Sequence, residues 1–172
     1  VIPGLSAVAA GRCADAACTG FGAWQSLYSG SATLGKNGID ARPGTPPVVV
    51  FARTFGFQVV RCSTDDCNQI SGTSGPLASG AVPAVAISAT GLPIIAAKTG
   101  DSTVSVFECA TTDCASLVPG GTISTGLDNI GVGIGIADAG PGGAYVAFGT
   151  VSSRLYLAHC TGTACASQTL VR

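Results

Sequence analysis

The sequence predicts an all-β fold, a small β-propeller of about four blades in which each blade is an antiparallel four-stranded meander. Three observations support this prediction. Cysteines recur in four equally spaced pairs, strand-like apolar runs precede the pairs, and no segment has the pattern of a helix. The 172 residues are enough for one domain with its own core, so we expect a single propeller domain over residues 1–172.

The cysteine pairs set the period of the repeat. Each pair has four residues between its members, and the first members of successive pairs are 49, 47 and 51 residues apart. A four-stranded propeller blade has a period of about 40–50 residues. The period divides the chain into repeats at approximately residues 1–38, 39–80, 81–126 and 127–172. The pairs are Cys13 with Cys18, Cys62 with Cys67, Cys109 with Cys114, and Cys160 with Cys165.

The strands of each repeat are predicted from short apolar runs that are rich in β-branched residues and bounded by Gly, Pro, Asp or Ser. One run ends at the first cysteine of each pair, and a weaker strand follows the second cysteine. In three repeats a second apolar run precedes this one, at 46–52, 92–97 and 144–148. In two repeats a third run precedes the second, at 81–89 and 130–137. Turn residues at 54–56, 99–102 and 150–153 join the runs into hairpins. Gly and Pro interrupt every window long enough for a stable helix.

The residue count leaves one blade incomplete. Between successive pairs lie 43, 41 and 45 residues, whereas the 7 residues after Cys165 and the 12 before Cys13 make only 19. The first repeat therefore lacks two of the strands found in the others. Because open sheet edges recruit partners, we expect a homo-oligomer or polymer whose terminal segments, 1–5 and 168–172, make the contact.

The cysteine pairs have two interpretations. A pair is half of a zinc site, or it is a disulfide that closes the turn between the third and fourth strands. A spacing of four residues is compatible with zinc, but two pairs would have to meet, and equivalent turns of neighbouring blades lie apart. We therefore expect four local disulfides and no metal. Disulfides form in oxidising compartments, so an extracellular or cell-surface location is expected.

Residues with catalytic chemistry are scarce, with one His and one Glu in the chain. His159 and Glu108 directly precede the first cysteine of their pairs, as Arg12 and Arg61 do, which indicates a variable polar strand position. The glycines at 131–135 do not fit a phosphate-binding motif, because no helix and no lysine follow them. We expect no enzyme, no catalytic residue and no cofactor.

The charge and hydropathy of the sequence limit the classes of partner that we expect. Charged residues make up 10% of the chain and the net charge is −1, without the basic cluster that nucleic-acid binding needs. The uncharged stretch 80–97 is long enough to suggest a membrane span, but prolines and glycines interrupt it and its repeat equivalents carry charge. We expect neither nucleic-acid binding nor a membrane span. The 33 Ser and Thr residues, many in predicted turns, predict O-linked sugars.

The succession of apolar strand, turn, apolar strand and Cys-x4-Cys resembles secreted prokaryotic β-propeller repeat proteins with a disulfide-closed hairpin in each blade. The resemblance covers essentially the whole chain, and the cysteine spacing is its specific part. Some such proteins look like building blocks of extracellular fibres, which implies a non-catalytic structural subunit that self-assembles. The alternative is a carbohydrate-binding propeller, a lectin or adhesin, with Phe21, Trp24 and Tyr28 as a sugar-stacking cluster. The other interpretation of this aromatic cluster is a packed interface or closure element.

Overall fold

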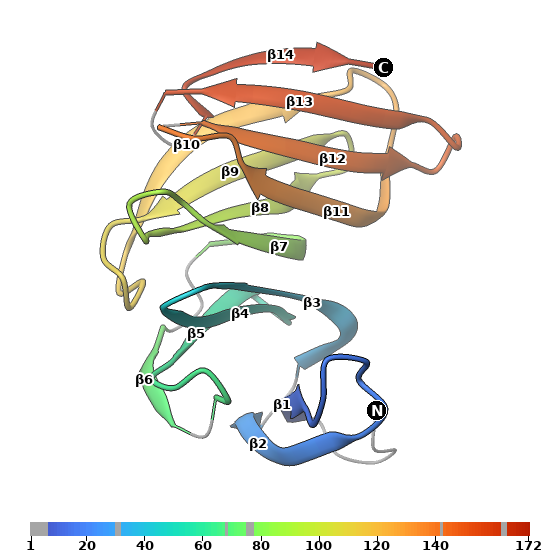
Figure 1. Cartoon of the computed structure of the whole chain (residues 1–172). Helices are drawn as coiled ribbons and strands as arrows, with labels where there is room; N and C mark the ends of the chain where they lie inside the picture. The colour runs from blue at the N-terminus through green and yellow to red at the C-terminus, as the bar shows by residue number, and fades with distance from the viewer. Residues whose placement is uncertain (1–6, 30–31, 68, 75–77, 142, 163–164) are drawn as a thin grey trace.

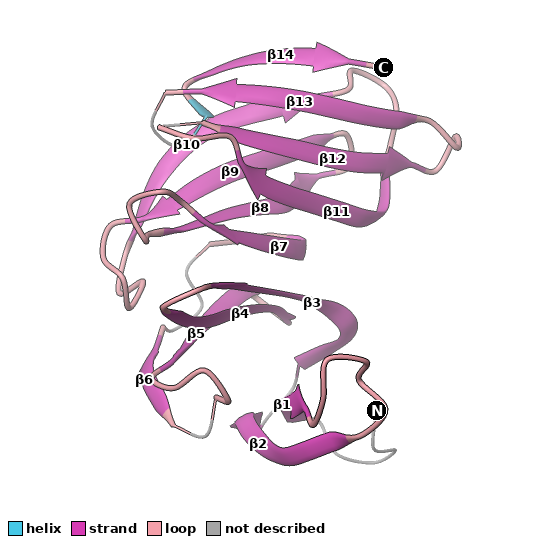
Figure 2. Cartoon of the chain, viewed as in Figure 1, coloured by secondary structure: helices cyan, strands magenta, loops and turns pink. Residues whose placement is uncertain are grey.

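The computed structural model describes residues 7–29, 32–67, 69–74, 78–141, 143–162 and 165–172. Over these residues the chain forms fourteen strands in four antiparallel sheets (Figures 1 and 2). The prediction of an all-β fold built from antiparallel meanders is confirmed. In the described part of the chain, no helix is long and apolar enough to cross a membrane.

The sheets follow one another along the chain, and the strands within each sheet pair in chain order. Sheet 1 holds β1 (Ala7–Cys13) and β2 (Phe21–Ser29). Sheet 2 holds β3 (Ala32–Arg42), β4 (Thr45–Arg53), β5 (Gly56–Cys62) and β6 (Ile70–Thr73). Sheet 3 holds β7 (Ala81–Ile87), β8 (Pro93–Gly100), β9 (Thr103–Cys109) and β10 (Leu117–Ser124). Sheet 4 holds β11 (Ile130–Asp138), β12 (Ala144–Thr150), β13 (Leu155–Thr161) and β14 (Ser167–Val171).

The strand that the sequence did not predict is β3. It contains polar residues and glycines, and it crosses the approximate repeat boundary between residues 38 and 39. One of its glycines has a packing reason, since a Cβ added at Gly38 would lie 3.2 Å from the Cα of Ala84 in sheet 3. On the opposite side of β3, Ile39 is 62% exposed. A strand with one crowded and one open side does not give the apolar run by which its equivalents are recognised.

The hairpin turns form where the sequence predicts them. One example joins β4 to β5, where Gly56 has a φ of 117°. A Cβ at Gly56 would collide with the carbonyl oxygen of Ala78. Only glycine satisfies both conditions, because residues with a Cβ rarely adopt this φ and have no room here.

Apolar layers separate the successive sheets, so that the sheets stack in the order of the chain (Figure 1). Each four-stranded sheet has a disulfide face, which carries its Cys pair, and an aliphatic face on the other side. The disulfide face of one sheet packs against the aliphatic face of the sheet before it. The layer between sheets 2 and 3 contains Val48, Val50, Phe57 and Val59 from the former and Val85, Ile87, Ile95, Ala97, Cys109 and Cys114 from the latter.

The first strands of the three four-stranded sheets lie closest together. Strand β7 contacts both β3 and β11. Polar contacts join the same strands, since the backbone N–H of Ile87 donates to the Asp40 carboxylate at 2.6 Å. The Arg42 guanidinium at the end of β3 forms a 2.6 Å ion pair with Asp138 at the end of β11. Residues 96 positions apart in the chain therefore meet where these strands converge.

Candidate functional site

The four predicted disulfides are present, each between cysteines five positions apart. The described residues of the four loops share two features of backbone geometry. The backbone N–H of each second cysteine donates to the carbonyl three residues earlier, at 3.0–3.2 Å. Each second cysteine also has a positive φ, of 54°, 59°, 56° and 67° in chain order. Repetition of the sequence spacing therefore gives repetition of the loop geometry.

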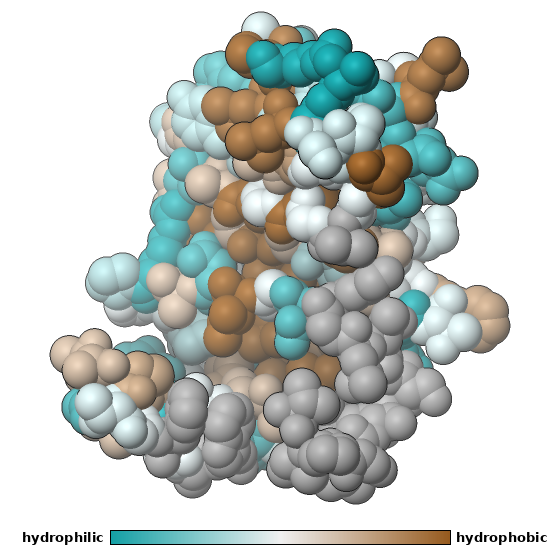
Figure 3. All heavy atoms as spheres, turned by 90° about the vertical axis from the view of Figure 1, so that its right-hand side faces the viewer, coloured by the Kyte–Doolittle hydropathy of each residue, from teal (hydrophilic) through white to brown (hydrophobic). Residues whose placement is uncertain are grey.

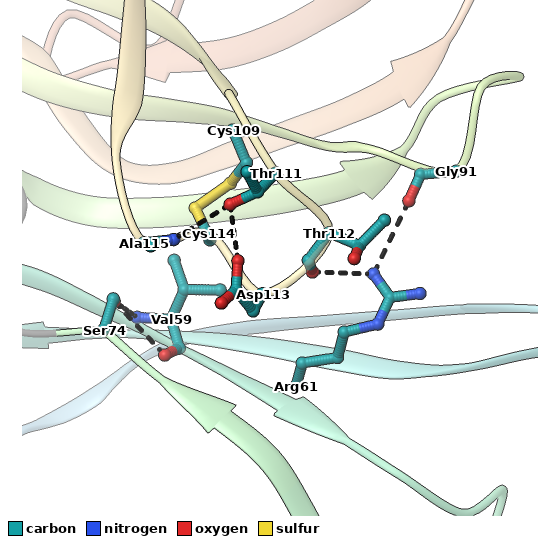
Figure 4. Close-up of a disulfide and its surroundings, with 10 residues drawn as sticks. All are labelled: Val59, Arg61, Ser74, Gly91, Cys109, Thr111, Thr112, Asp113, Cys114 and Ala115. Atoms are coloured by element: carbon teal, nitrogen blue, oxygen red, sulfur yellow. Dashed lines mark hydrogen bonds between the residues drawn. A yellow bond between two sulfur atoms is a disulfide. The ribbon is translucent and has the colours of Figure 1, made fainter.

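The disulfide loop of each inner sheet is part of a junction with the sheet before it. Figure 4 shows this for sheets 2 and 3. The Arg61 guanidinium at the end of β5 donates to the carbonyl of Thr112, inside the Cys109–Cys114 loop, at 2.9 Å. A longer contact of 3.5 Å reaches the carbonyl of Gly91. Arg61 precedes the first cysteine of sheet 2, so this polar position bridges to the loop of the next sheet.

Hydrogen bonds between residues of the loop also stabilise the loop in Figure 4. The Thr111 hydroxyl donates to the Asp113 carboxylate and accepts a 3.3 Å hydrogen bond from the backbone N–H of Ala115. The hydroxyl bond to Asp113 holds the pKa of this carboxyl below its usual value. In the Cys13–Cys18 loop, Asp15 accepts hydrogen bonds from Thr19 with the same effect on its pKa.

The junction between sheets 3 and 4 repeats the same pairing of faces. Buried residues of β8 and β9 cover the disulfide face of sheet 4, where Cys160 and Cys165 are also buried. Glu108 occupies the position of Arg61 and lines a cavity of about 180 Å³, to which Gly162 and Cys165 of the next loop also contribute. His159 and Glu108, which the sequence interprets as variable polar strand positions, lie in β13 and β9, directly before the first cysteine of their sheets.

The positions that carry the junction can be numbered from the first cysteine of each sheet. Three of these positions lie on the aliphatic face. Two are the residues three and five positions before the first cysteine, and the third is the cross-strand partner of the residue directly before that cysteine. In sheets 2 and 3 all six are buried, with exposures of 6% or less. These residues are Val48, Phe57 and Val59 in sheet 2, and Ile94, Val104 and Val106 in sheet 3.

Sheet 4 keeps the same positions apolar but leaves them uncovered. Its equivalents are Tyr145, Leu155 and Leu157, which are 43%, 70% and 45% exposed. His159 is exposed beside them, with its imidazole stacked on the Tyr145 ring at 4.7 Å between centroids. We call these four residues the open face of sheet 4.

Sheet 1 leaves the complementary half of the junction uncovered. Cys13 is half-buried and Cys18 is exposed, whereas the other six cysteines are at most 3% exposed. Its other side is closed, because Val8 and Leu27 pack into the layer against sheet 2. Among the described residues, sheet 1 therefore has an open disulfide face and sheet 4 an open aliphatic face.

The aromatic cluster that the sequence singled out lies in β2. The Tyr28 ring packs on Phe51 of sheet 2 at 5.3 Å between centroids, with the Arg53 guanidinium 4.7 Å from its centre. The side chains of Phe21 and Trp24 lie outside the described residues, so their part in a sugar site stays a prediction. Residues 1–5, the N-terminal half of the predicted contact, also lie outside them, and residues 168–172 belong to β14 and its end.

A second polar cluster, which the sequence did not single out, joins the connection between β10 and β11 to sheet 4. The Asp128 carboxylate accepts hydrogen bonds from the Arg154 guanidinium, at 2.6 and 2.8 Å, and from the Tyr156 hydroxyl, at 2.6 Å. These donors hold the pKa of Asp128 below its usual value, with Tyr156 the largest cause. The cluster fixes the connection before β11 to the hairpin between β12 and β13.

Among the described residues no three His, Cys, Asp or Glu side chains lie together as a metal site would require. Comparisons with models of protein families, with curated proteins and with solved structures find no match for this chain. The open sheet faces are therefore the candidate functional surfaces.

The apolar residues of β13 indicate the open face of sheet 4 only once the structure is known. The residues before Cys160 are apolar on both sides of β13, as in the covered sheets. Their pattern predicts burial of both faces, and the structure shows that one face is open. A polar face would have indicated a finished end to the stack.

Proposed function

We propose that this chain is a non-catalytic structural subunit that works outside the cell, that its sheets are blades of a β-propeller, and that its copies self-assemble into a fibre or oligomer. The observation that carries the proposal is the pair of open faces at the two ends of the sheet stack. Large exposed apolar surfaces on soluble proteins mark interaction sites. The four disulfides indicate the oxidising environment that an extracellular role requires.

The arrangement of the first strands supports the propeller. In a propeller the blades pack around a common axis, with one strand of each blade nearest to it. The contacts of β7 with β3 and β11, and the Arg42–Asp138 ion pair, bring the first strands of three sheets to one place. Sheet 1 corresponds to the last two strands of a blade, since β1 ends at the first cysteine of its pair.

The missing half of that blade supports assembly. Among the described strands, β1 pairs only with β2, whereas its equivalents β5, β9 and β13 pair on both sides. A groove of about 230 Å³ lies between β1 and sheet 2, lined by Val8, Gly11, Gly38 and Ile39 among others. Free strand edges accept further strands through backbone hydrogen bonds. Contact through the terminal strands would therefore pair the edge of β1 that no described strand covers.

Sedimentation velocity of the native protein across a wide concentration range, together with negative-stain electron microscopy, tests the proposal. We expect concentration-dependent association and, at high concentration, filaments or closed oligomers. A monomer at every concentration would overturn it. Selective binding on a glycan array by that monomer would favour the carbohydrate-binding alternative instead.

A further inference from the structure

We propose that the open face of sheet 4 binds the disulfide loop of sheet 1 in a second copy of this chain, so that copies join head to tail. The inference rests on the proposed self-assembly and specifies its two surfaces. On one copy the surface is Tyr145, Leu155, Leu157 and His159. On the other it is the loop from Cys13 to Cys18.

The first argument is what covers the equivalent positions inside the chain. The positions of Leu155 and Leu157 are those of Phe57 and Val59 in sheet 2, which share a buried cluster with the Cys109–Cys114 disulfide. In sheet 3 the same positions share a buried cluster with Cys160 and Cys165. At both junctions the cover is the disulfide face of the next sheet. The open face of sheet 4 thus has the composition of a surface that takes such a cover.

The second argument is that the chain carries one uncovered disulfide, and it is at the opposite end of the stack. Cys18 is exposed at sheet 1, and the residues of its loop, 14–17, are exposed as well. Sheets 1 and 4 lie at opposite ends of the molecule in Figure 1, with sheets 2 and 3 between them. Both halves of the junction are therefore present on one copy but too far apart to cover one another. A second copy brings the halves together, and a contact between unlike surfaces propagates.

The surface chemistry agrees with this occupant. Figure 3, a view from the right-hand side of Figure 1, shows brown apolar residues interspersed with teal polar residues at the top of the molecule, where sheet 4 lies. On the open face itself, Leu155 and Leu157 are 70% and 45% exposed. The loop of sheet 1 is Ala14-Asp-Ala-Ala17, which is small and carries one charge, on Asp15. That carboxylate is already engaged by Thr19. No like charges oppose one another, because His159 is the only titratable side chain besides Tyr145 on the open face.

The junction in Figure 4 gives the register of the contact. Arg61 donates to the carbonyl of Thr112, which is three positions after Cys109. The equivalent of Arg61 in sheet 4 is His159, and the residue three positions after Cys13 is Ala16. The register therefore places the His159 imidazole as a donor to the carbonyl of Ala16 in the second copy. Leu157 then covers the Cys13–Cys18 disulfide, as Val59 packs in the cluster of Cys109–Cys114.

Two matched variants test the surface on sheet 4. Leu157→Asp places a charge in the proposed contact, and Leu127→Asp makes the same change at a leucine that is 100% exposed in a turn elsewhere. Leu157 is 45% exposed, so covering the rest of its side chain corresponds to roughly three- to tenfold in an association constant, and desolvation of the new carboxylate adds to the loss. We expect Leu157→Asp to weaken association in sedimentation velocity by at least about tenfold, and Leu127→Asp to leave it unchanged. Circular dichroism of both variants checks that the sheets remain folded.

Photo-cross-linking tests the partner surface without relying on a destabilising change. The isotopically labelled copies carry a benzophenone amino acid in place of Leu157. They are mixed with unlabelled copies, so that links between a labelled and an unlabelled copy are recognised by mass. We expect cross-links between copies to the peptide that contains residues 13–18. Ala16→Arg in the unlabelled copy should remove them.

The outcomes separate the two proposals. Association that persists in Leu157→Asp, or cross-links that map to another surface, would overturn the head-to-tail contact and leave self-assembly standing. Cross-links from position 157 to residues 13–18 within one copy would overturn the second copy as occupant and indicate closure of the chain on itself. A native protein that never associates would overturn self-assembly itself.

Discussion

Removal of two disulfides with equal loops should destabilise the protein by different amounts. The changes are Cys109→Ala with Cys114→Ala, and Cys13→Ala with Cys18→Ala. Both loops have the same length, so loss of the cross-link costs about 2 kcal/mol in each case in the chain-entropy model. The second cysteines have φ values of 56° and 54°, so the backbone penalty of alanine there is also equal.

The difference lies in burial. Cys109 and Cys114 are fully buried between sheets 2 and 3, whereas Cys13 is half-buried and Cys18 is exposed. Deletion of a buried atom of methyl size costs about 1 kcal/mol. The inner pair should therefore cost about 4 kcal/mol in total and the outer pair about 2 kcal/mol.

Guanidinium unfolding of the two double variants, followed by circular dichroism without reductant, measures this difference. The comparison of midpoints is valid where the slope of the free energy with denaturant is unchanged. Equal losses in the two variants, or a larger loss for the outer pair, would refute the reasoning that the disulfide faces are sealed by the preceding sheet.

Three further predictions concern single positions. Gly56→Ala should lower the free energy of unfolding by more than about 3 kcal/mol, because it combines a positive φ with a collision against the Ala78 carbonyl. Gly44→Ala, at a φ of 75° in open space, should cost only about 1 kcal/mol. Thermal unfolding compares the two variants. The lowered pKa of Asp128 stabilises the fold above the ordinary value of 3.8, and this stabilisation should be lost as the pH falls through the lower folded pKa. Urea unfolding from pH 6 to about 2 should therefore show a flatter profile for Asp128→Asn, and an unchanged profile would contradict the assignment. Arg61→Met should cost about 1 kcal/mol and accelerate amide exchange in the loop around Thr112, and exchange unchanged there would argue against the bridge.

The repeat, its strands and its disulfides could be predicted because each depends on local pattern. Turn residues and β-branched runs recur at fixed distances from each cysteine pair, and four copies reinforce one another. Strand β3 escaped prediction because Ile39 on its open side and Gly38 on its crowded side do not alternate as a half-buried strand does.

The candidate site could not be predicted, because exposure depends on which sheet lies next. Leu155 and Leu157 have the same character as Phe57 and Val59, and only the arrangement of the sheets shows that the first two are uncovered. Nothing in the local sequence marks Asp128 as the centre of a polar cluster. Its partner Tyr156 lies 28 positions later, which is beyond any local pattern.

The confinement of every disulfide to its own turn has a consequence for how this protein is made and how its gene can change. Eight cysteines allow 105 pairings, yet each native bond joins partners only five positions apart. Closure of so short a segment is fast, so each bond can form as soon as its own turn meets an oxidising environment, before any neighbouring unit has folded. Since no bond ties one unit to another, a whole unit can be duplicated or deleted without leaving an orphaned thiol. Oxidation therefore sets no limit on the number of units, and chains of different length can mature by the same route.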